Sequence, residues 1–235
     1  MSKDTGVLFF FDTYSTGMKL LRLKHWQLFL ITFVVPFVAY LIGIISFAVV
    51  MVRGSIAGEK FGYQFVPQVK DFIPLIVGGA IMLAGVITHY VWMYSAATRL
   101  QAYMHPDMRK LKVKRFRIFF FSPFLYLLLM GILLPVLFSF QPDQHTPPAG
   151  PFITIIIVII LGHSYSAFCM IYVLYFSAKT VKSAELQREA HFSDYIGEFF
   201  MFWFFPVGVW FLQPKINKII GRSDTEFESA ELLEQ

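Results

Sequence analysis

Two histidines lie inside long apolar stretches of the sequence, His89 in the second stretch and His163 in the fourth. Polar groups inside lipid are costly, so such histidines are candidates for lining a pore, relaying protons or bonding one helix to another. Gly162 and Ser166 belong to the same polar turn as His163 and are candidates for the same roles. The preferred interpretation is structural, because a neutral histidine can simply hydrogen-bond a hydroxyl or a carbonyl across a helix contact.

Few residues have the spacing of a catalytic or metal site. Gly162, His163 and Ser164 place a base beside a hydroxyl, but adjacent residues on a helix point about 100° apart, and no third group completes a nucleophilic set. The six histidines lack the paired spacing of zinc-binding helices. The one cysteine excludes an intramolecular disulfide. The sequence therefore predicts no metal, no cofactor and no catalytic residue.

A polar cluster precedes the aromatic stretch near the carboxyl end and contains His191, Ser193, Asp194 and Glu198. At headgroup level these side chains would suit an enzyme that modifies lipids. Ser193 and Asp194 are equally good caps for the start of a helix. Capping is the preferred interpretation.

The most basic segment runs from residue 98 to residue 117 and joins two apolar stretches. Against one acidic residue it contains seven bases: Arg99, Arg109, Lys110, Lys112, Lys114, Arg115 and Arg117. With the aromatic side chains near them, these bases would suit an anionic ligand such as a nucleotide, an oligonucleotide or a phosphorylated headgroup. Membrane topology and lipid contact also account for such charge, because cytoplasmic loops are basic as a rule and each base near the surface gains about 1 kcal/mol from anionic membrane lipid.

The composition is that of a membrane protein: 57% of the 235 residues are hydrophobic, 15% are charged and the mean hydropathy is +0.61. Four apolar runs lie at about 27–52, 72–97, 116–140 and 152–177. Each exceeds the roughly 20 helical residues that cross a hydrocarbon layer. The predicted fold class is an all-α membrane protein, a four-transmembrane-helix bundle. The second and fourth helices are expected to continue into the polar segments that follow them.

The basic residues also predict the orientation of the chain. Seventeen of the twenty Lys and Arg residues lie before the first run, between the second and third, or after the fourth, and the other three lie at 53–71. Positive residues stay in the cytoplasm, so both termini are predicted to be cytoplasmic and the loops at 53–71 and 141–150 external. Residues 1–222 are expected to form one membrane domain, followed by a loose acidic tail at 223–235.

An aromatic segment lies at about 194–213, and its uncharged part at 199–212 has about 14 residues, too few to cross the membrane, with two helix breakers, Pro206 and Gly208. We expect it to lie in the membrane plane or to re-enter the membrane. Three tryptophans suit the interfacial zone and are predicted to anchor the protein there: Trp26, Trp203 and Trp210.

Small residues in the second run predict close helix packing. Ala80, Ala84 and Gly85 leave room for another helix to approach. Four helices alone form a thin bundle, so self-association into a homo-oligomer is expected.

Residues 21–29 (LRLKHWQLF) and 194–214 (DYIGEFFMFWFFPVGVWFLQP) resemble segments of small uncharacterised bacterial multi-span inner-membrane proteins. The resemblance covers the two edges of the chain and implies no particular activity. It favours the inner (plasma) membrane of a bacterium as the location.

Three functions fit these patterns. The leading hypothesis is a non-enzymatic homo-oligomeric ion channel or membrane-disrupting effector that an anionic ligand controls from the basic cytoplasmic face. The alternative is a structural or assembly subunit of a larger membrane complex, whose helices dock those of a protein partner. An enzyme that modifies lipid headgroups comes third.

Overall fold

The computed structural model describes residues 16–104, 112–139 and 149–233, and it is all-helical, with no strand in these ranges. A short helix at 16–22 is followed by ten labelled elements. They are α2 (His25–Phe29), the π-helix η1 (Leu30–Val34), α3 (Val35–Phe61), the 3₁₀-helix η2 (Val69–Phe72), α4 (Ile73–Arg99), the 3₁₀-helix η3 (Leu100–Tyr103), α5 (Val113–Ser139), α6 (Ala149–Leu186), α7 (Phe192–Trp203) and α8 (Phe205–Leu233).

Four helical segments are long and apolar enough to cross a membrane, as the sequence predicts: His25–Phe61, Val69–Tyr103, Val113–Ile132 and Ile156–Leu186. The first is 37 residues long and the second 35, well above the roughly 20 that a hydrocarbon layer requires. These lengths and compositions are those of a multi-pass membrane protein.

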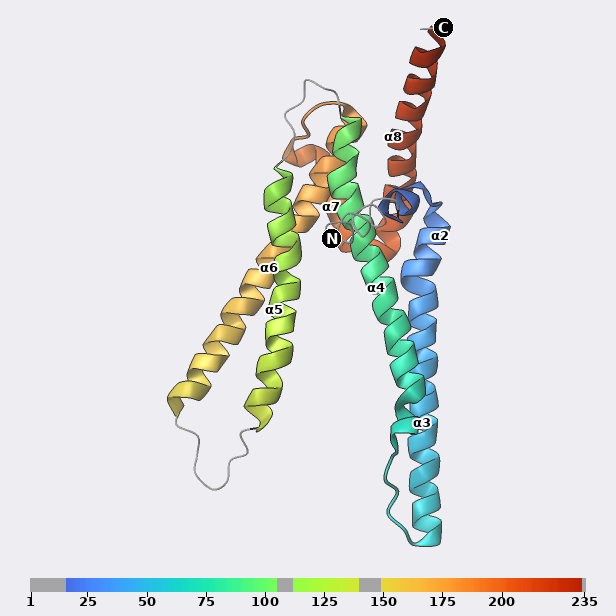
Figure 1. Ribbon diagram of the computed structural model, residues 1–235, viewed down its shortest axis with the longest axis vertical. Helices are drawn as coiled ribbons and strands as arrows, with labels where there is room; N and C mark the ends of the chain where they lie inside the picture. The colour runs from blue at the N-terminus through green and yellow to red at the C-terminus, as the bar shows by residue number, and fades with distance from the viewer. Residues whose placement is uncertain (1–15, 105–111, 140–148, 234–235) are drawn as a thin grey trace, which may run out of the picture.

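The first hairpin consists of α3 and α4, which run side by side in opposite directions (Figure 1). Glycines allow this approach, because a Cβ at Gly43 would lie 2.6 Å from the carbonyl oxygen of Pro74 and one at Gly78 would lie 2.7 Å from that of Ala39. The widened turn of η1 lies just before Pro36, whose missing N–H cannot donate to the preceding turn. Any Cβ at Gly85 would collide with the Pro36 ring.

The second hairpin consists of α5 and α6, which also run side by side (Figure 1). Tyr126 of α5 lies directly over Gly162 of α6, and its hydroxyl hydrogen-bonds Nδ1 of His163. One turn nearer the start of α5, the hydroxyls of Ser122 and Tyr165 lie 3.1 Å apart and share a hydrogen bond. These polar groups thus join α5 to α6.

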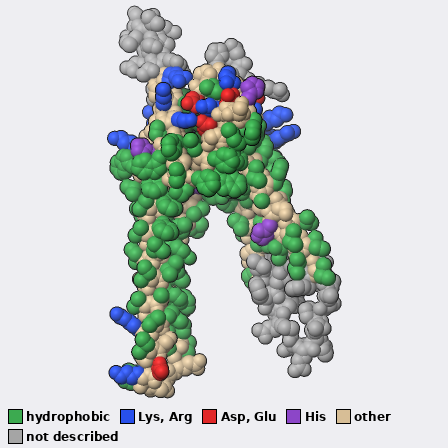
Figure 2. Space-filling view, turned by 180° about the vertical axis from the view of Figure 1, so that it is seen from behind, with side chains coloured by type: hydrophobic (Ala, Val, Ile, Leu, Met, Phe, Trp, Pro, Cys, Tyr) green, Lys and Arg blue, Asp and Glu red, His purple; other side chains and the backbone are tan. Residues whose placement is uncertain are grey.

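The two hairpins meet at one end and diverge from it (Figure 1). Every ring contact described between α4 and α5 involves Tyr90 or Tyr94, in the last three turns of α4. In Figure 2 apolar side chains cover the first hairpin and much of the coloured part of the second, and most charged side chains gather where the hairpins meet. We call this end the head; it comprises residues 16–24, 90–104, 112–120 and 173–222.

Most of the buried core lies in the head. Its largest fully buried side chains include Trp92, Phe116, Phe202, Leu212 and Ile216, which come from α4, α5, α7 and α8. The predicted bundle is thus a pair of hairpins splayed from one packed end.

Three helix boundaries differ from the sequence prediction. Helix α3 continues to Phe61, although the sequence predicts a loop from residue 53, because no proline interrupts it before Gly62, which adopts a left-handed conformation (φ 70°) and ends the helix. Helix α6 enters its polar extension as predicted but ends at Leu186, where Gln187 is left-handed (φ 51°). Residues 223–233 belong to α8 rather than to a loose tail.

The aromatic segment forms two helices that join at Phe204. Pro206 lies in the first turn of α8, where a proline is tolerated because the N–H it lacks has no partner within the helix. Gly208 packs against the carbonyl oxygen of Met201 so closely that a Cβ would collide with it. We call residues 203–208 the elbow.

Candidate functional site

A buried carboxylate lies at the centre of the head. Glu198 of α7 is 3% exposed, and its Oε1 lies 2.5 Å from Nζ of Lys215 on α8 and 3.5 Å from Nζ of Lys182 on α6. Glu185 of α6 completes the cluster, 2.9 Å from Lys182 and 3.8 Å from Lys215. Two acids and two bases therefore connect three helices.

The lysines keep Glu198 charged. Burial alone raises the pKa of Glu198, but the hydrogen bond from Lys215, a backbone hydrogen bond and the charges of Lys215 and Lys182 together hold the pKa below its ordinary value. A carboxylate that is fully ion-paired on two sides is a structural connector rather than a proton donor at neutral pH.

Two further ion pairs close the turn between α6 and α7. Lys179 pairs with Glu189 at 2.8 Å, and Arg188 pairs with Asp194 at 2.9 Å. Asp194 also accepts a hydrogen bond from the backbone N–H of His191 at 3.0 Å, and that bond and Arg188 lower its pKa. The capping interpretation is confirmed for Asp194, and the two acidic residues of the polar cluster, Asp194 and Glu198, are both engaged in ion pairs.

A buried glutamine fastens α8 to two other segments. Oε1 of Gln213 accepts a hydrogen bond from Nε1 of Trp92 at 2.8 Å. Nε2 of Gln213 lies 2.8 Å from the carbonyl oxygens of both Leu21 and Leu23. Asn217, one turn later, donates to the Leu23 carbonyl at 3.0 Å. These carbonyls end the helix at 16–22, so the two amides of α8 cap it.

The elbow packs against the first hairpin. The ring of Phe205 lies 3.8 Å from that of His89 and 5.5 Å from that of Trp92, between ring centroids. Phe202 lies 5.5 Å from Trp92. On the other side of the head, Tyr195 of α7 packs against Tyr175 of α6 at 5.5 Å. Helices α7 and α8 therefore connect the two hairpins.

The seven predicted ligand-binding bases do not all come together. Lys112, Lys114, Arg115 and Arg117 lie exposed at the beginning of α5. Arg99 is partly buried at the end of α4, with its guanidinium group beside Gly17. Arg109 and Lys110 lie outside the described residues.

The predicted pore or packing residues divide into packed and exposed groups. Gly85 and Gly162 lie at contacts inside the first and second hairpins, respectively. Ala80 and Ala84 are exposed on α4, away from α3. The predicted small-residue surface therefore consists of two faces, one occupied within the chain and one open.

The polar members of that set differ in their partners. His163 hydrogen-bonds Tyr126, and its Nδ1 lies 3.0 Å from the Ile159 carbonyl oxygen, as expected for a histidine that bonds helices. Nδ1 of His89 and Oγ of Ser166 are buried with no hydrogen-bond partner among the described residues.

The three predicted anchors are exposed on the head or next to it. Trp26, Trp203 and Trp210 are 45%, 53% and 44% exposed. Other exposed apolar side chains of α7 and α8 accompany them: Phe200, Phe204, Val207 and Phe211. Together these residues form an aromatic belt at and around the elbow.

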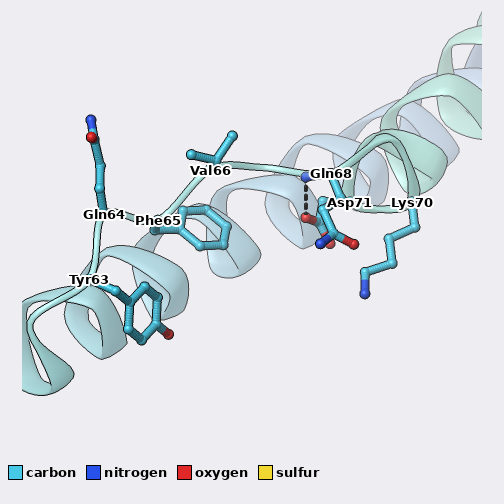
Figure 3. A pocket seen from close by; sticks show the side chains of 7 residues that line it. All are labelled: Tyr63, Gln64, Phe65, Val66, Gln68, Lys70 and Asp71. Atoms are coloured by element: carbon cyan, nitrogen blue, oxygen red, sulfur yellow. Dashed lines mark hydrogen bonds between the residues drawn. The ribbon is translucent and has the colours of Figure 1, made fainter.

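A hollow of about 430 Å³ lies at the opposite end of the first hairpin, lined by residues of the loop at 63–71. Its one drawn hydrogen bond joins the backbone N–H of Gln68 to Asp71 at 2.8 Å (Figure 3). In Figure 3, Gln64 and Val66 point to one side of the loop and Lys70 to the other, so the polar groups do not converge on one ligand.

The described residues contain no group of three or more His, Cys, Asp or Glu side chains that could hold a metal ion. The chain matches no protein-family model, no curated protein and no solved structure. The function must therefore be inferred from the geometry alone.

Sequence reasoning missed the partners of Glu198 and the role of Gln213. Both residues lie beyond the fourth apolar run, and one charge or amide in an aromatic segment does not indicate which helix supplies its partner. The only signal in the sequence is that a polar residue in apolar surroundings requires a hydrogen-bonding or charged partner.

Proposed function

We propose that the head lies in the cytoplasm and that the chain crosses the inner membrane of a bacterium four times. The support is that residues 16–24, the connector ends and α8 all lie at one end of the molecule (Figure 1), and that fourteen of the twenty Lys and Arg residues belong to the head. The aromatic belt then lies at the cytoplasmic membrane surface and the elbow re-enters the lipid only slightly.

In this orientation the protein is a non-enzymatic assembly component, whose two hairpins bind further transmembrane helices. One observation carries the proposal: the hairpins diverge from a fixed head and leave their apolar faces uncovered. Only 11–22% of the residues in the apolar windows of the four spans are buried within the chain. Ion pairs and buried amides, in contrast, connect most elements of the head.

A second copy of the chain is the first partner to consider. Ala80 and Ala84 lie one turn apart on α4 and are exposed, and large exposed side chains, Ile76, Leu83 and Ile87, surround them. Small residues framed by large ones allow two helices to approach closely. The expected assembly is a homo-oligomer held through α4, to which other membrane proteins can add.

A homo-oligomeric ion channel is the second candidate, and one feature favours it. His163, Ser164 and Tyr165 lie exposed in the middle of α6, where lipid is an unfavourable neighbour for polar groups. In an oligomer these residues would line a shared path. Control by a nucleotide or oligonucleotide would then act through the exposed bases of α5.

One experiment separates the two candidates. The purified protein is reconstituted alone into liposomes, cross-linked to determine its copy number, and assayed for the release of entrapped K⁺. Cross-linked oligomers without ion flux support the assembly function, and flux that a His163→Leu variant abolishes supports the channel. A protein that remains monomeric in lipid and conducts no ions contradicts both.

A further inference from the structure

The acidic and basic side chains of the head are unevenly matched. All four acidic residues among its described residues are ion-paired, namely Glu185, Glu189, Asp194 and Glu198, and their partners are bases of α6, of α8 and of the turn between α6 and α7. The bases at the beginning of α5 have no such partner in the part of the chain that the structure describes. They are Lys112, Lys114, Arg115 and Arg117, all exposed. Their positive charge is therefore uncompensated within the head.

The position of these bases on α5 indicates what compensates it. One face of α5 is apolar and strongly exposed along about four turns, at Ile118, Phe121, Leu125, Leu128 and Ile132. The spacing of three or four residues places these side chains in one stripe along the helix. Their exposure, 56–70% in each case, leaves the stripe free to face lipid in a transmembrane helix.

Lys114 and Arg117 continue this stripe. Lys114 precedes Ile118 by four residues, and Arg117 precedes Phe121 by four, so each base lies one helical turn beyond an apolar member of the stripe. Both bases therefore project from the lipid-facing side of α5, just where its apolar surface ends. Phosphate groups of lipids lie at that level of a membrane, and long basic side chains extend toward them.

We propose that the beginning of α5 is a binding site for the headgroup of an anionic phospholipid. Lys114 and Arg117 contact its phosphate, Lys112 and Arg115 add positive charge, and its acyl chains lie along Ile118 and Phe121. The site does not depend on what the hairpins bind. Among the anionic ligands that would suit the basic connector, the proposal selects a phospholipid, which reaches the protein from within the membrane.

Native mass spectrometry of the full-length protein in a neutral detergent tests the site. The detergent solution is titrated with phosphatidylglycerol or with phosphatidylcholine, and the first bound lipid is quantified for wild type, for Lys114→Gln/Arg117→Gln and for Lys19→Gln/Lys218→Gln. The control double variant removes two exposed bases elsewhere on the head. Phosphatidylglycerol should bind wild type and the control more tightly than phosphatidylcholine does.

The test variant should bind phosphatidylglycerol about 25-fold more weakly, since each base near anionic lipid contributes about 1 kcal/mol, or a factor of about five. Arg117→Lys keeps the charge and should bind phosphatidylglycerol almost as tightly as wild type does. It therefore shows that a change at this position does not by itself prevent folding. Equal binding of the two lipids, or equal losses in the two double variants, overturns the site. So does binding of ATP or inorganic phosphate that is tighter than that of phosphatidylglycerol and is lost in the same variant.

Discussion

Trp92 of α4 donates a hydrogen bond from Nε1 to Oε1 of Gln213 on α8 across 2.8 Å, and both side chains are fully buried. The two residues are 121 positions apart in the sequence. Because the amide nitrogen of the same Gln213 bonds the end of the helix at 16–22, this contact joins three distant segments. It holds the carboxyl-terminal helix in the head, although no apolar periodicity could place it there.

Replacing Gln213 should destabilise the head more than replacing Trp92. Gln213→Ala leaves the indole N–H and the Leu21 carbonyl oxygen without partners in a buried site and the Leu23 carbonyl oxygen with Asn217 alone, at a cost of about 2–4 kcal/mol. Trp92→Phe leaves only one acceptor unpaired, at a cost of about 1–2 kcal/mol. Thermal unfolding in detergent should therefore give a lower midpoint for Gln213→Ala. Equal midpoints for both variants would mean that the bonds to the helix at 16–22 contribute nothing.

Stability should fall in acid because of Glu198. A carboxyl group whose pKa is lowered by folding stabilises the folded state above its ordinary pKa of 4.5, and this contribution is lost as the pH falls through the lowered value. Unfolding midpoints should be nearly constant from about pH 7 to pH 5 and then decrease.

The matched variant is Glu198→Gln, which keeps the shape of the side chain but not its charge. It leaves Lys215 and Lys182 with one carboxylate, Glu185, and should lower stability at pH 7 by about 1–3 kcal/mol, a range reduced to allow for the partial exposure of the lysines. Its acid decrease should also be smaller than that of wild type. An unchanged pH profile in the variant would show that Glu198 does not cause the acid sensitivity.

The sequence was sufficient to predict the four helices but not how they are arranged. Apolar runs longer than a membrane is thick predict spans directly, and all four occur. Whether the spans form one bundle depends on which faces pack together, and faces that meet lipid are as apolar as faces that meet protein. The four apolar runs therefore do not indicate that the helices form two splayed hairpins.

The same limit applies to single residues. Ala84 and Gly85 are adjacent and equally small, yet Gly85 packs against Pro36 while Ala84 is exposed. Composition gives both residues the same role, and only the direction of each Cα–Cβ bond separates them. Partners of the ion-paired Glu198 were hidden for a similar reason, because Lys182 and Lys215 lie on different helices.

Topology can be tested with reporter fusions. A reporter that is active only in the cytoplasm should be active after Gln235 and inactive within 62–68 or 141–148, because the base distribution keeps the head inside. An inactive carboxyl-terminal fusion would mean that the elbow region crosses the membrane as a fifth span, and the proposed position of the head would be wrong.

The last prediction uses the adjacent pair Ala84 and Gly85 to separate self-association from folding. Gly85→Leu forces a side chain into the Pro36 ring and toward the carbonyl oxygen of Thr32, which lies 3.1 Å from where a Cβ would be. We expect this variant to separate α3 from α4, to unfold about 2–12 °C lower than wild type, and to express poorly, because overpacking costs about 1–3 kcal/mol. Ala84→Leu adds the same side chain on the exposed face of α4, so its unfolding midpoint should stay within about 2 °C of wild type.

If copies of the chain associate through Ala80 and Ala84, Ala84→Leu should nevertheless reduce the cross-linked oligomers several-fold in liposomes, since the larger side chain keeps two helices apart. Val86→Leu, a conservative change at an exposed position on another side of α4, serves as the control and should leave both measurements unchanged. Undiminished cross-linking of Ala84→Leu would remove this face from the assembly, while a large loss of thermal stability in Ala84→Leu would contradict its exposed position.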